Sequence, residues 1–305
     1  MSTLVYLSPH LDDAVLSCGG QIAQYARRGE RVLVVTVFAG DVPAEAARTK
    51  FVQELHTRWG AGQNPPAARR AEDVEACRVL GAEAIHLGFP DCIYRLGRMG
   101  GPLYPTREAI FCEAAPVETP LVDEIASALG RLVAKEWPEV AGLARGARYR
   151  GAMVFLPLTA GHHVDHQIVR AAGEQWAKSE SGRRLRIAHY EDYPYAESPQ
   201  EVESALEGHP ALRYRANRAK GHESPTAAAQ VGYTVNVVEL GEDAIKAKLE
   251  AIACYRSQLS TFFADGAEME ARVRAYARAV GGGRPAERVW KQITTNLGYN
   301  EFGIE

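Results

Sequence analysis

The sequence lacks the long apolar segments and the targeting signals that would direct the chain into or through a membrane. No apolar run approaches the roughly 18 residues that a bilayer-spanning helix requires. The first residues lack a basic start, a long apolar stretch and a cleavage site, which are the three parts of a secretory signal. We therefore expect no secretory signal and no insertion into a membrane.

Cysteines are few and scattered, which argues against a disulfide framework. Their number is odd, and no Cys-x-x-Cys or Cys-x-x-His pair occurs among Cys18, Cys77, Cys92, Cys112 and Cys254. Unpaired cysteines of this kind are typical of proteins in a reducing compartment. The sequence therefore indicates a cytoplasmic protein whose cysteines are reduced.

An excess of charge of one sign is also missing. The 35 basic and 38 acidic residues are intermixed and give a formal net charge of -3. A nucleic-acid-binding surface would need a basic stripe, and we interpret the short arginine-rich stretch 145–150 as a solvated loop. We expect a globular protein that takes a small molecule and no nucleic acid as its partner, with a homo-oligomer left open.

What the sequence does contain is an alternation of strand and helix signals. Short apolar runs predict strands, and the segments between them carry apolar residues at helical spacing. Because parallel strands need crossover connections, this order predicts an α/β fold with a Rossmann-like, mostly parallel sheet and helices on both faces. The predicted strands are 4–7, 31–38, 84–87, 152–156, 185–190 and 230–240, and the predicted helices are 14–28, 69–80, 121–135, 164–178 and 244–258.

No boundary divides the chain, so we expect a single domain over residues 1–305. Residues 40–66, with at most one short helix, and the Pro- and Gly-rich residues 89–120 are expected to form loops that shape the substrate site. Residues 198–224 have weak periodicity and receive no assignment.

A first cluster of polar residues, Pro9-His10-Leu11-Asp12-Asp13, directly follows the first predicted strand. Ligands of open α/β sheets bind outside the carboxyl ends of the strands. Two carboxylates and an imidazole this close would repel and desolvate one another unless a cation were present. The alternative is an Asp-rich turn that caps the next helix, and this cluster alone does not separate the two interpretations.

A second cluster, His162-His163-Val164-Asp165-His166, follows the predicted strand 152–156 and opens a helix. His163 and His166 are three residues apart and therefore share one helical face. Exposed histidines at a helix start are the alternative, but two such clusters at strand-to-helix junctions favour a common metal site. A His, Asp, His set with an open position for water is typical of catalytic zinc, and imidazole ligands suit Fe²⁺ or another divalent transition metal equally.

The two motifs resemble those of the family of N-acetylglucosaminyl-phosphatidylinositol de-N-acetylases and LmbE-like proteins. Its members carry Pro-His-x-Asp-Asp after the first strand and His-x-Asp-His later, here residues 9–13 and 163–166. Further similar segments bring the resemblance to most of the chain, from residue 4 to about 258; they are residues 69–72, 88–91, 190–195 and 255–258. Where many members have Glu and Pro, this chain has Ala14 and Val164, which bears on the substrate subclass.

The resemblance implies a zinc-dependent N-deacetylase. Such a hydrolase would remove an N-acyl group, with acetyl the first expectation, from an amino sugar or glycoconjugate by attack of a metal-bound water. On the matching motif positions, the resemblance makes His10, Asp13 and His166 the metal ligands.

The resemblance also implies the catalytic roles around the metal. Asp12 would be the general base, and His163, tuned by Asp165, would assist the tetrahedral intermediate or the leaving amine. Arg69 and Asp91 would contact the substrate, with Arg70 as the alternative to Arg69. Five tyrosines are candidates either for the sugar pocket or for core packing, namely Tyr94, Tyr104, Tyr190, Tyr193 and Tyr195.

Other functions remain to be distinguished from deacetylation. One is an amidase or esterase acting on a different small molecule, such as a thiol conjugate or a natural-product intermediate. Another is a metal-containing sugar-binding protein without turnover, which would gain little from a second, non-ligating carboxylate. A dinucleotide-binding protein is disfavoured because Ser17-Cys18-Gly19-Gly20 is not a G-x-G-x-x-G turn.

Overall fold

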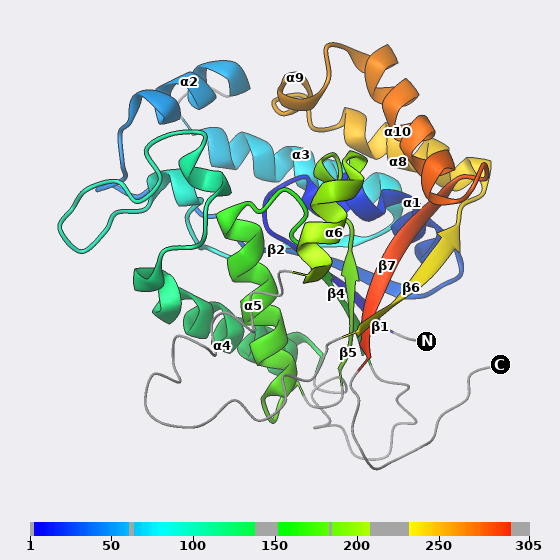
Figure 1. The fold of residues 1–305 in the computed structure, drawn as a ribbon, viewed down its shortest axis with the longest axis horizontal. Helices are drawn as coiled ribbons and strands as arrows, with labels where there is room; N and C mark the ends of the chain where they lie inside the picture. Colours follow the sequence, from blue (N-terminus) through cyan, green and yellow to red (C-terminus); the bar gives the residue numbers. More distant parts are fainter. Residues whose placement is uncertain (1–2, 61–63, 138–151, 183–184, 208–231, 294–305) are drawn as a thin grey trace.

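The computed structural model describes residues 3–60, 64–137, 152–182, 185–207 and 232–293, whose seven strands form one sheet in the order β3-β2-β1-β4-β5-β7-β6 (Figure 1). Strands β1 to β5 are parallel, β7 is antiparallel to β5, and β6 is antiparallel to β7. The strands are β1 (Thr3–Ser8), β2 (Arg31–Thr36), β3 (Glu83–His86), β4 (Ala152–Pro157), β5 (Arg186–Tyr190), β6 (Gly232–Glu239) and β7 (Ala286–Ile293). The predicted α/β fold with a mostly parallel sheet is confirmed.

Helices cover both faces of this sheet, with α1, α3 and α8 on one face and α4 and α5 on the other (Figure 1). The helices are α1 (Asp13–Arg27), α2 (Lys50–Trp59), α3 (Pro65–Leu80), α4 (Thr119–Glu136), α5 (Val164–Lys178), α6 (Pro199–Glu207), α8 (Glu242–Ala253), α9 (Leu259–Phe262) and α10 (Gly266–Val280). Short 3-10 turns are η1 (Cys92–Tyr94), η2 (Ala109–Phe111), η3 (Pro116–Glu118) and η4 (Tyr195–Glu197). None of the helices in the described ranges has the length and apolarity that crossing a bilayer requires.

Strand β1 shows why its sequence is a continuous apolar run. Leu4 and Tyr6 pack into the core beneath α1, α3 and α8, whereas Val5 and Leu7 pack into the core beneath α4 and α5. Successive side chains of a strand point to opposite faces, and both faces of this sheet are covered. Burial of each such side chain contributes about 1.5–3 kcal/mol, so the two cores together fix the strand in the middle of the sheet.

The order of the strands creates one position at which loops diverge. Strand β1 lies between β2 and β4. From β1 the chain continues to β2 and β3 on one side and then crosses over to β4 and β5 on the other. Such a switch point is where open α/β sheets bind ligands, and here it places the segments that follow β1 and β4 side by side.

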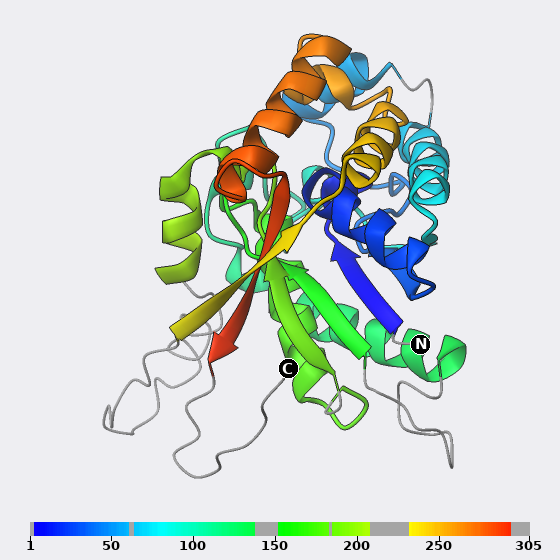
Figure 2. The same ribbon diagram turned by 90° about the vertical axis from the view of Figure 1, so that its right-hand side faces the viewer.

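The C-terminal part adds elements that no sequence pattern was used to predict. Beyond residue 258 the structure contains α9, α10 and β7, and Figure 2 shows β6 and β7 running antiparallel along one edge of the sheet. The arginine-rich stretch 145–150 and most of 198–224 lie outside the described residues. A single domain over all 305 residues extends beyond the described ranges and stays a prediction.

The helix predicted over 244–258 ends at Ala253 because the next residues bind to α3 instead of continuing the helix. The Tyr255 hydroxyl donates to Asp73 at 2.6 Å. Ser257 donates to Glu72 from its backbone N–H at 3.0 Å and from its hydroxyl at 2.6 Å. These buried bonds direct the segment after α8 toward the carboxyl ends of the strands.

A buried ion pair ties this C-terminal part to α1. Lys248 Nζ of α8 lies 2.7 Å from Glu287 Oε1 of β7, and each side chain is 4% exposed. Glu287 also accepts the backbone N–H groups of Gly20 at 3.0 Å and Gln21 at 2.8 Å. Strand β7 therefore holds the helix whose first residue is Asp13.

Replacing only the cation of this pair would leave a buried carboxylate uncompensated. We expect Lys248→Met to lower the free energy of unfolding by about 3–5 kcal/mol. Glu83→Gln is the matched control, because its partner Arg31 lies 2.8 Å away in a pair whose side chains are 40% and 55% exposed. That change should cost at most about 1 kcal/mol. Urea unfolding measures both, and equal losses would contradict a structural role for the buried pair.

Candidate active site

The turn between β1 and α1 is shaped by side chains that bind its own backbone. Ser8 Oγ donates to the carbonyl of His10 at 2.6 Å and accepts the N–H of Ala14 at 3.0 Å. Asp13 Oδ2 accepts the N–H of His10 at 2.8 Å. Asp12 occupies the N-cap position of α1 but its side chain makes no capping hydrogen bond. Helix capping therefore does not account for Asp12.

The turn between β4 and α5 needs an unusual backbone. Gly161 and His162 have φ angles of 80° and 60°, and a Cβ atom at Gly161 would lie 2.4 Å from Tyr195 Cγ. This turn places His163 at the N-cap of α5, where His163 Nδ1 accepts the N–H of Asp165 at 3.2 Å. Because Nδ1 accepts a hydrogen bond, a neutral His163 carries its proton on Nε2.

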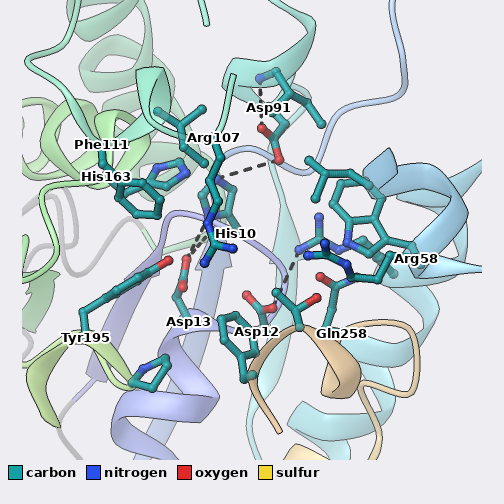
Figure 3. Close-up of a pocket in the computed structure, with 18 of the residues that line it drawn as sticks. His10, Asp12, Asp13, Arg58, Asp91, Arg107, Phe111, His163, Tyr195 and Gln258 are labelled. Atoms are coloured by element: carbon teal, nitrogen blue, oxygen red, sulfur yellow. Dashed lines mark hydrogen bonds and ion pairs between the residues drawn. The ribbon is translucent and has the colours of Figure 1, made fainter. Parts of the chain in front are cut away.

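The two turns bring the carboxylate of Asp13 and the imidazoles of His10 and His166 together. Figure 3 shows Asp13 beside His10. Asp13 Oδ2 lies 3.1 Å from His10 Nδ1 and 3.3 Å from His166 Nε2. The rings of His10, His163 and His166 offer nitrogens within 4.8 Å of one another. Ligand atoms at about 2.0–2.2 Å from a tetrahedral zinc ion lie roughly 3.3 Å apart. The chemistry and spacing of this donor set fit a divalent transition metal.

Each of the two imidazoles has a buried carboxylate on its other ring nitrogen. His10 Nε2 lies 2.9 Å from Asp165 Oδ2, and His166 Nδ1 lies 2.7 Å from Asp192 Oδ1. Asp165 is 0% exposed and Asp192 is 2% exposed. Carboxylates in this position orient a metal-binding histidine and raise its basicity. Asp192 was not predicted, although it follows β5 at the same edge of the sheet as both motifs.

The contacts of Asp165 differ from a simple pairing with His163. Its carboxylate binds His10, Arg95 NH2 at 2.6 Å and the N–H of Cys92 at 3.0 Å, and only its backbone N–H reaches His163. Burial and then the neighbouring His10 hold the pKa of His163 well below its ordinary value, while the charge of Asp165 acts in the opposite direction. The predicted tuning of His163 by Asp165 would therefore depend on the charge of Asp165, and it stays a prediction.

Asp12 lies beside this donor set as a second carboxylate. It is 4% exposed, and Arg69 NH2 lies 3.8 Å from its Oδ2. Burial and then the charge of Asp13 raise the pKa of Asp12 to about 7, against the lowering effect of Arg69. A cation bound nearby would also lower it. A carboxylate whose pKa lies near the working pH is suited to take up and return a proton.

His10, Asp12, Asp13 and His163 line one end of a cavity of about 500 Å³ (Figure 3). Its walls come from α2, from the loop around η2, from η4 and from the segment of α9. Of these wall residues, Tyr195 was a candidate from the sequence, and Gln258 belongs to the similar segment 255–258. The lining residues outside the two motifs include Phe51, Glu54, Leu55, Arg58, Trp59, Arg107, Ile110, Phe111, Tyr195, Gln258, Thr261 and Phe262.

The predicted substrate residues are placed differently from one another. Arg69 and Asp91 line the cavity, whereas Arg70 is held by Asp41, whose Oδ1 lies 2.7 Å from Arg70 NH2. The Arg69 guanidinium lies 4.8 Å from the ring centroid of Trp59. Arg69 Nε is buried and has no hydrogen-bond partner within the described part of the chain. Arg69 is thus the arginine of this pair that faces the cavity.

Comparisons with known proteins agree with this geometry. Two curated relatives are 2'-N-acetylparomamine deacetylases. The protein of Niallia circulans is 35% identical over 118 residues, which are 35% of this chain and 42% of the relative. The protein of Streptomyces fradiae is 30% identical over 192 residues, which are 62% of this chain and 56% of the relative. The matched segments thus span about half the length of these relatives.

Solved structures extend the similarity to nearly the whole chain. A deacetylase from the biosynthesis pathway of teicoplanin is 25% identical, with a TM-score of 0.72 over 97% of this chain and 100% of the other. The zinc-inhibited form of teicoplanin deacetylase gives a TM-score of 0.71 at the same identity and the same coverage.

The family model described as PIG-L, GlcNAc-PI de-N-acetylase, matches residues 5–177, a segment that includes both motifs. This match covers more than half of the chain. The chain therefore belongs to the PIG-L family of GlcNAc-PI de-N-acetylases.

Proposed function

We propose that this chain is a metal-dependent hydrolase that removes an acetyl group from the nitrogen of an amino sugar or glycoconjugate. The observation that carries the proposal is the convergence of His10, Asp13 and His166, with the separate carboxylate of Asp12 beside them. Of the relatives named as deacetylases, one is named for 2'-N-acetylparomamine and another for the biosynthesis pathway of teicoplanin. Both descriptions support an N-acetylated, sugar-containing substrate for this chain.

The metal would be held by His10, Asp13 and His166, with zinc as the first candidate. Two imidazoles and a carboxylate suit zinc, and they suit Fe²⁺ and other divalent transition metals as well. When bound, such an ion supplies Lewis acidity, which polarises an amide carbonyl and acidifies water. Because one similar structure is a zinc-inhibited form, the activating metal is treated as a variable in the experiment below.

Asp12 would move the proton that hydrolysis requires. It would accept the proton of the attacking water and return it to the nitrogen as the C–N bond breaks, which releases acetate and a free amine. Arg69, at 3.8 Å, would keep the carboxylate ionised before the reaction and aimed into the cavity. His163, whose Nδ1 is occupied by the N–H of Asp165, would donate from Nε2 to the developing oxyanion.

The cavity would hold the sugar near the two motifs and the rest of the substrate toward α2 and α9. The buried, unpaired Arg69 Nε and the carboxylate of Asp91 offer a donor and acceptors to sugar hydroxyls. Phe51 and Phe262 offer apolar contact on the part of the wall formed by α2 and α9, and Phe111 does so beside His163. This division of the cavity supports a conjugate rather than a free monosaccharide as the substrate.

A reaction assay with defined metals tests the proposal. Protein stripped with a chelator should lose activity, and one of Zn²⁺, Fe²⁺ or Co²⁺ should restore release of acetate and free amine from N-acetylglucosamine conjugates in equal amounts. Activity that survives complete removal of the metal would contradict the proposal.

The same assay separates the alternatives. An amidase or esterase for another small molecule would leave the N-acetyl sugars intact and hydrolyse a thiol conjugate or an ester. A metal-containing sugar-binding protein would bind the sugar but release no amine with any metal. The outcome is read as acetate, amine and bound metal on the same protein sample.

A cytoplasmic location is part of this proposal. All five cysteines are free, and four of them are buried, which suits a reducing compartment. Self-association and the absence of a nucleic-acid partner stay predictions.

A further inference from the structure

Arg95 lies at the centre of a buried row of charged side chains that no sequence motif singled out. Its NH2 lies 2.6 Å from Asp165 Oδ1, and its Nε lies 2.6 Å from Glu118 Oε1 as an ion pair. Arg95 is 9% exposed, Asp165 is 0% exposed and Glu118 is 5% exposed. The carboxylates of Asp165 and Glu118 thus share one guanidinium. Within the described ranges, Glu118 has no other cationic partner, and Asp165 has only the imidazole of His10.

One end of this row holds the metal-binding set. Asp165 Oδ2 lies 2.9 Å from His10 Nε2 and accepts the N–H of Cys92 at 3.0 Å. Its other oxygen, Oδ1, is taken by Arg95. Since both oxygens are fixed, the plane of the carboxylate cannot turn without losing a charged contact. Arg95 therefore controls the group that orients the His10 ring.

The other end of the row closes a loop of the cavity wall. Glu118 accepts a hydrogen bond from the Tyr104 hydroxyl, which in turn accepts the N–H of Ala115 at 2.9 Å. The Arg95 guanidinium lies 5.6 Å from the ring centroid of Tyr104. Between these two anchors the chain passes through Phe111, which lines the cavity. Arg95 is thus joined to the shape of that wall.

We infer that Arg95 is a positioning residue that couples the metal-binding His10 to the cavity wall around Phe111. Through Asp165 it sets the affinity of the site for the metal, and through Glu118 it sets the fit of the substrate. Arg95 touches neither the metal-binding atoms nor the cavity. The inference rests on the proposed function in one respect, namely that His10 is a metal ligand.

The arrangement around the second histidine offers a comparison. His166 is backed by Asp192, whose Oδ2 accepts the N–H of Ala160 at 3.0 Å, and no arginine pairs with Asp192 in the part of the chain that the structure describes. Asp165 is therefore held by an arginine side chain, whereas Asp192 is held by a backbone N–H. Loss of Arg95 should disturb the His10 side of the site and leave the His166 side intact.

The test uses Arg95→Lys, which keeps the positive charge but loses the planar group that contacts both carboxylates. Metal affinity of the purified protein is measured by competition with a chromogenic chelator. We expect Arg95→Lys and Asp165→Asn each to weaken metal binding by about 10–100-fold. If Arg95 acts through Asp165, the double variant should bind no more weakly than Asp165→Asn alone. Additive losses, or unchanged affinity in Arg95→Lys, would overturn the inference.

A second variant tests the contacts at the end of the row that lies next to the cavity wall. Tyr104→Phe removes the hydroxyl between Glu118 and Ala115 without changing a charge. It should raise KM several-fold and leave metal affinity unchanged, whereas Arg95→Lys should change both. An equal shift of metal affinity in the two variants would show that the row acts only as general packing.

The outcomes also separate this inference from the proposed function. If the wild-type protein bound no divalent metal, the proposed function itself would be contradicted. If the wild-type protein bound metal and was active, and Arg95→Lys had the same metal affinity and the same KM, only the coupling through Arg95 would be contradicted. Should Arg95→Lys fail to fold, Arg95→Met combined with Glu118→Gln takes its place in the same cycle, because it removes one carboxylate together with the cation.

Discussion

Asp12→Asn should lower kcat by about 10²–10⁴-fold while the protein keeps its metal. The side chain of Asp12 is buried beside the donor set, and its carboxylate pairs with Arg69 at 3.8 Å. Asparagine has nearly the same shape but cannot take up the proton of the attacking water. Acetate release at saturating substrate measures kcat, and elemental analysis of the same sample measures the bound metal.

The neighbouring carboxylate is the matched control for this substitution. Asp13 is 6% exposed, close to the 4% of Asp12, and both residues belong to the same turn. Asp13 Oδ2 lies near both His10 Nδ1 and His166 Nε2, so Asp13→Asn should lose the metal as well as the activity. Full turnover of metal-loaded Asp12→Asn, or loss of its metal, would show that the proton acceptor has been assigned wrongly.

His166→Ala should abolish metal binding and therefore activity. His166 is 1% exposed, and its Nε2 is one of the atoms grouped around Asp13. Loss of a ligand should weaken affinity beyond the about 10–100-fold that follows from loss of an outer carboxylate. The chelator competition assay gives the affinity, and addition of excess metal during the acetate assay shows how much activity can be recovered.

His163→Ala is the control for this prediction, because His163 is adjacent on the same helix turn and also buried. It should bind metal nearly as well as wild type but turn over more slowly, and added metal should not restore the rate. If His163→Ala also lost its metal, then His163 would belong to the ligand set, to which its ring is close enough. If His166→Ala bound metal normally, the ligand set would have to be drawn from the other groups of the cluster.

The central sheet could be predicted because its information is local and repeated. Runs such as Arg31–Thr36 are apolar on both faces, and Gly29 and Gly81 stop the helices on either side of that strand. Parallel order then follows from the crossover helices. Strand β6 lies within the predicted strand 230–240, whereas its partner β7 was not predicted from the sequence.

The two halves of the candidate site could be predicted for a different reason. His10, Asp12 and Asp13, and likewise His163 and His166, lie directly after strands, and parallel strands all end at one edge of the sheet. Proximity of two distant segments therefore follows from topology alone. Their exact pairing, in which Asp13 lies between two histidines, required the structure.

Other residues around the candidate site belong to no sequence pattern that would identify them. Arg95 and Glu118 are single charged residues in a Pro- and Gly-rich loop, and only the fold shows that both are buried and paired. Helix α2 could be expected as one short helix, but its place in the cavity wall depends on contacts far along the chain. The helix predicted over 244–258 was too long because the hydrogen bonds from Ser257 to Glu72 are tertiary contacts, which the local sequence does not indicate.

Residue 177, at which the match to the family model ends, also divides the residues around the cavity into two groups. The two turns proposed to bind the metal lie before this point, together with the wall residues of α2. Tyr195, Gln258 and Phe262, which also line the cavity, lie after it. Mutation, insertion or recombination in the later part can redirect recognition toward new conjugates while the inherited chemistry is passed on unchanged.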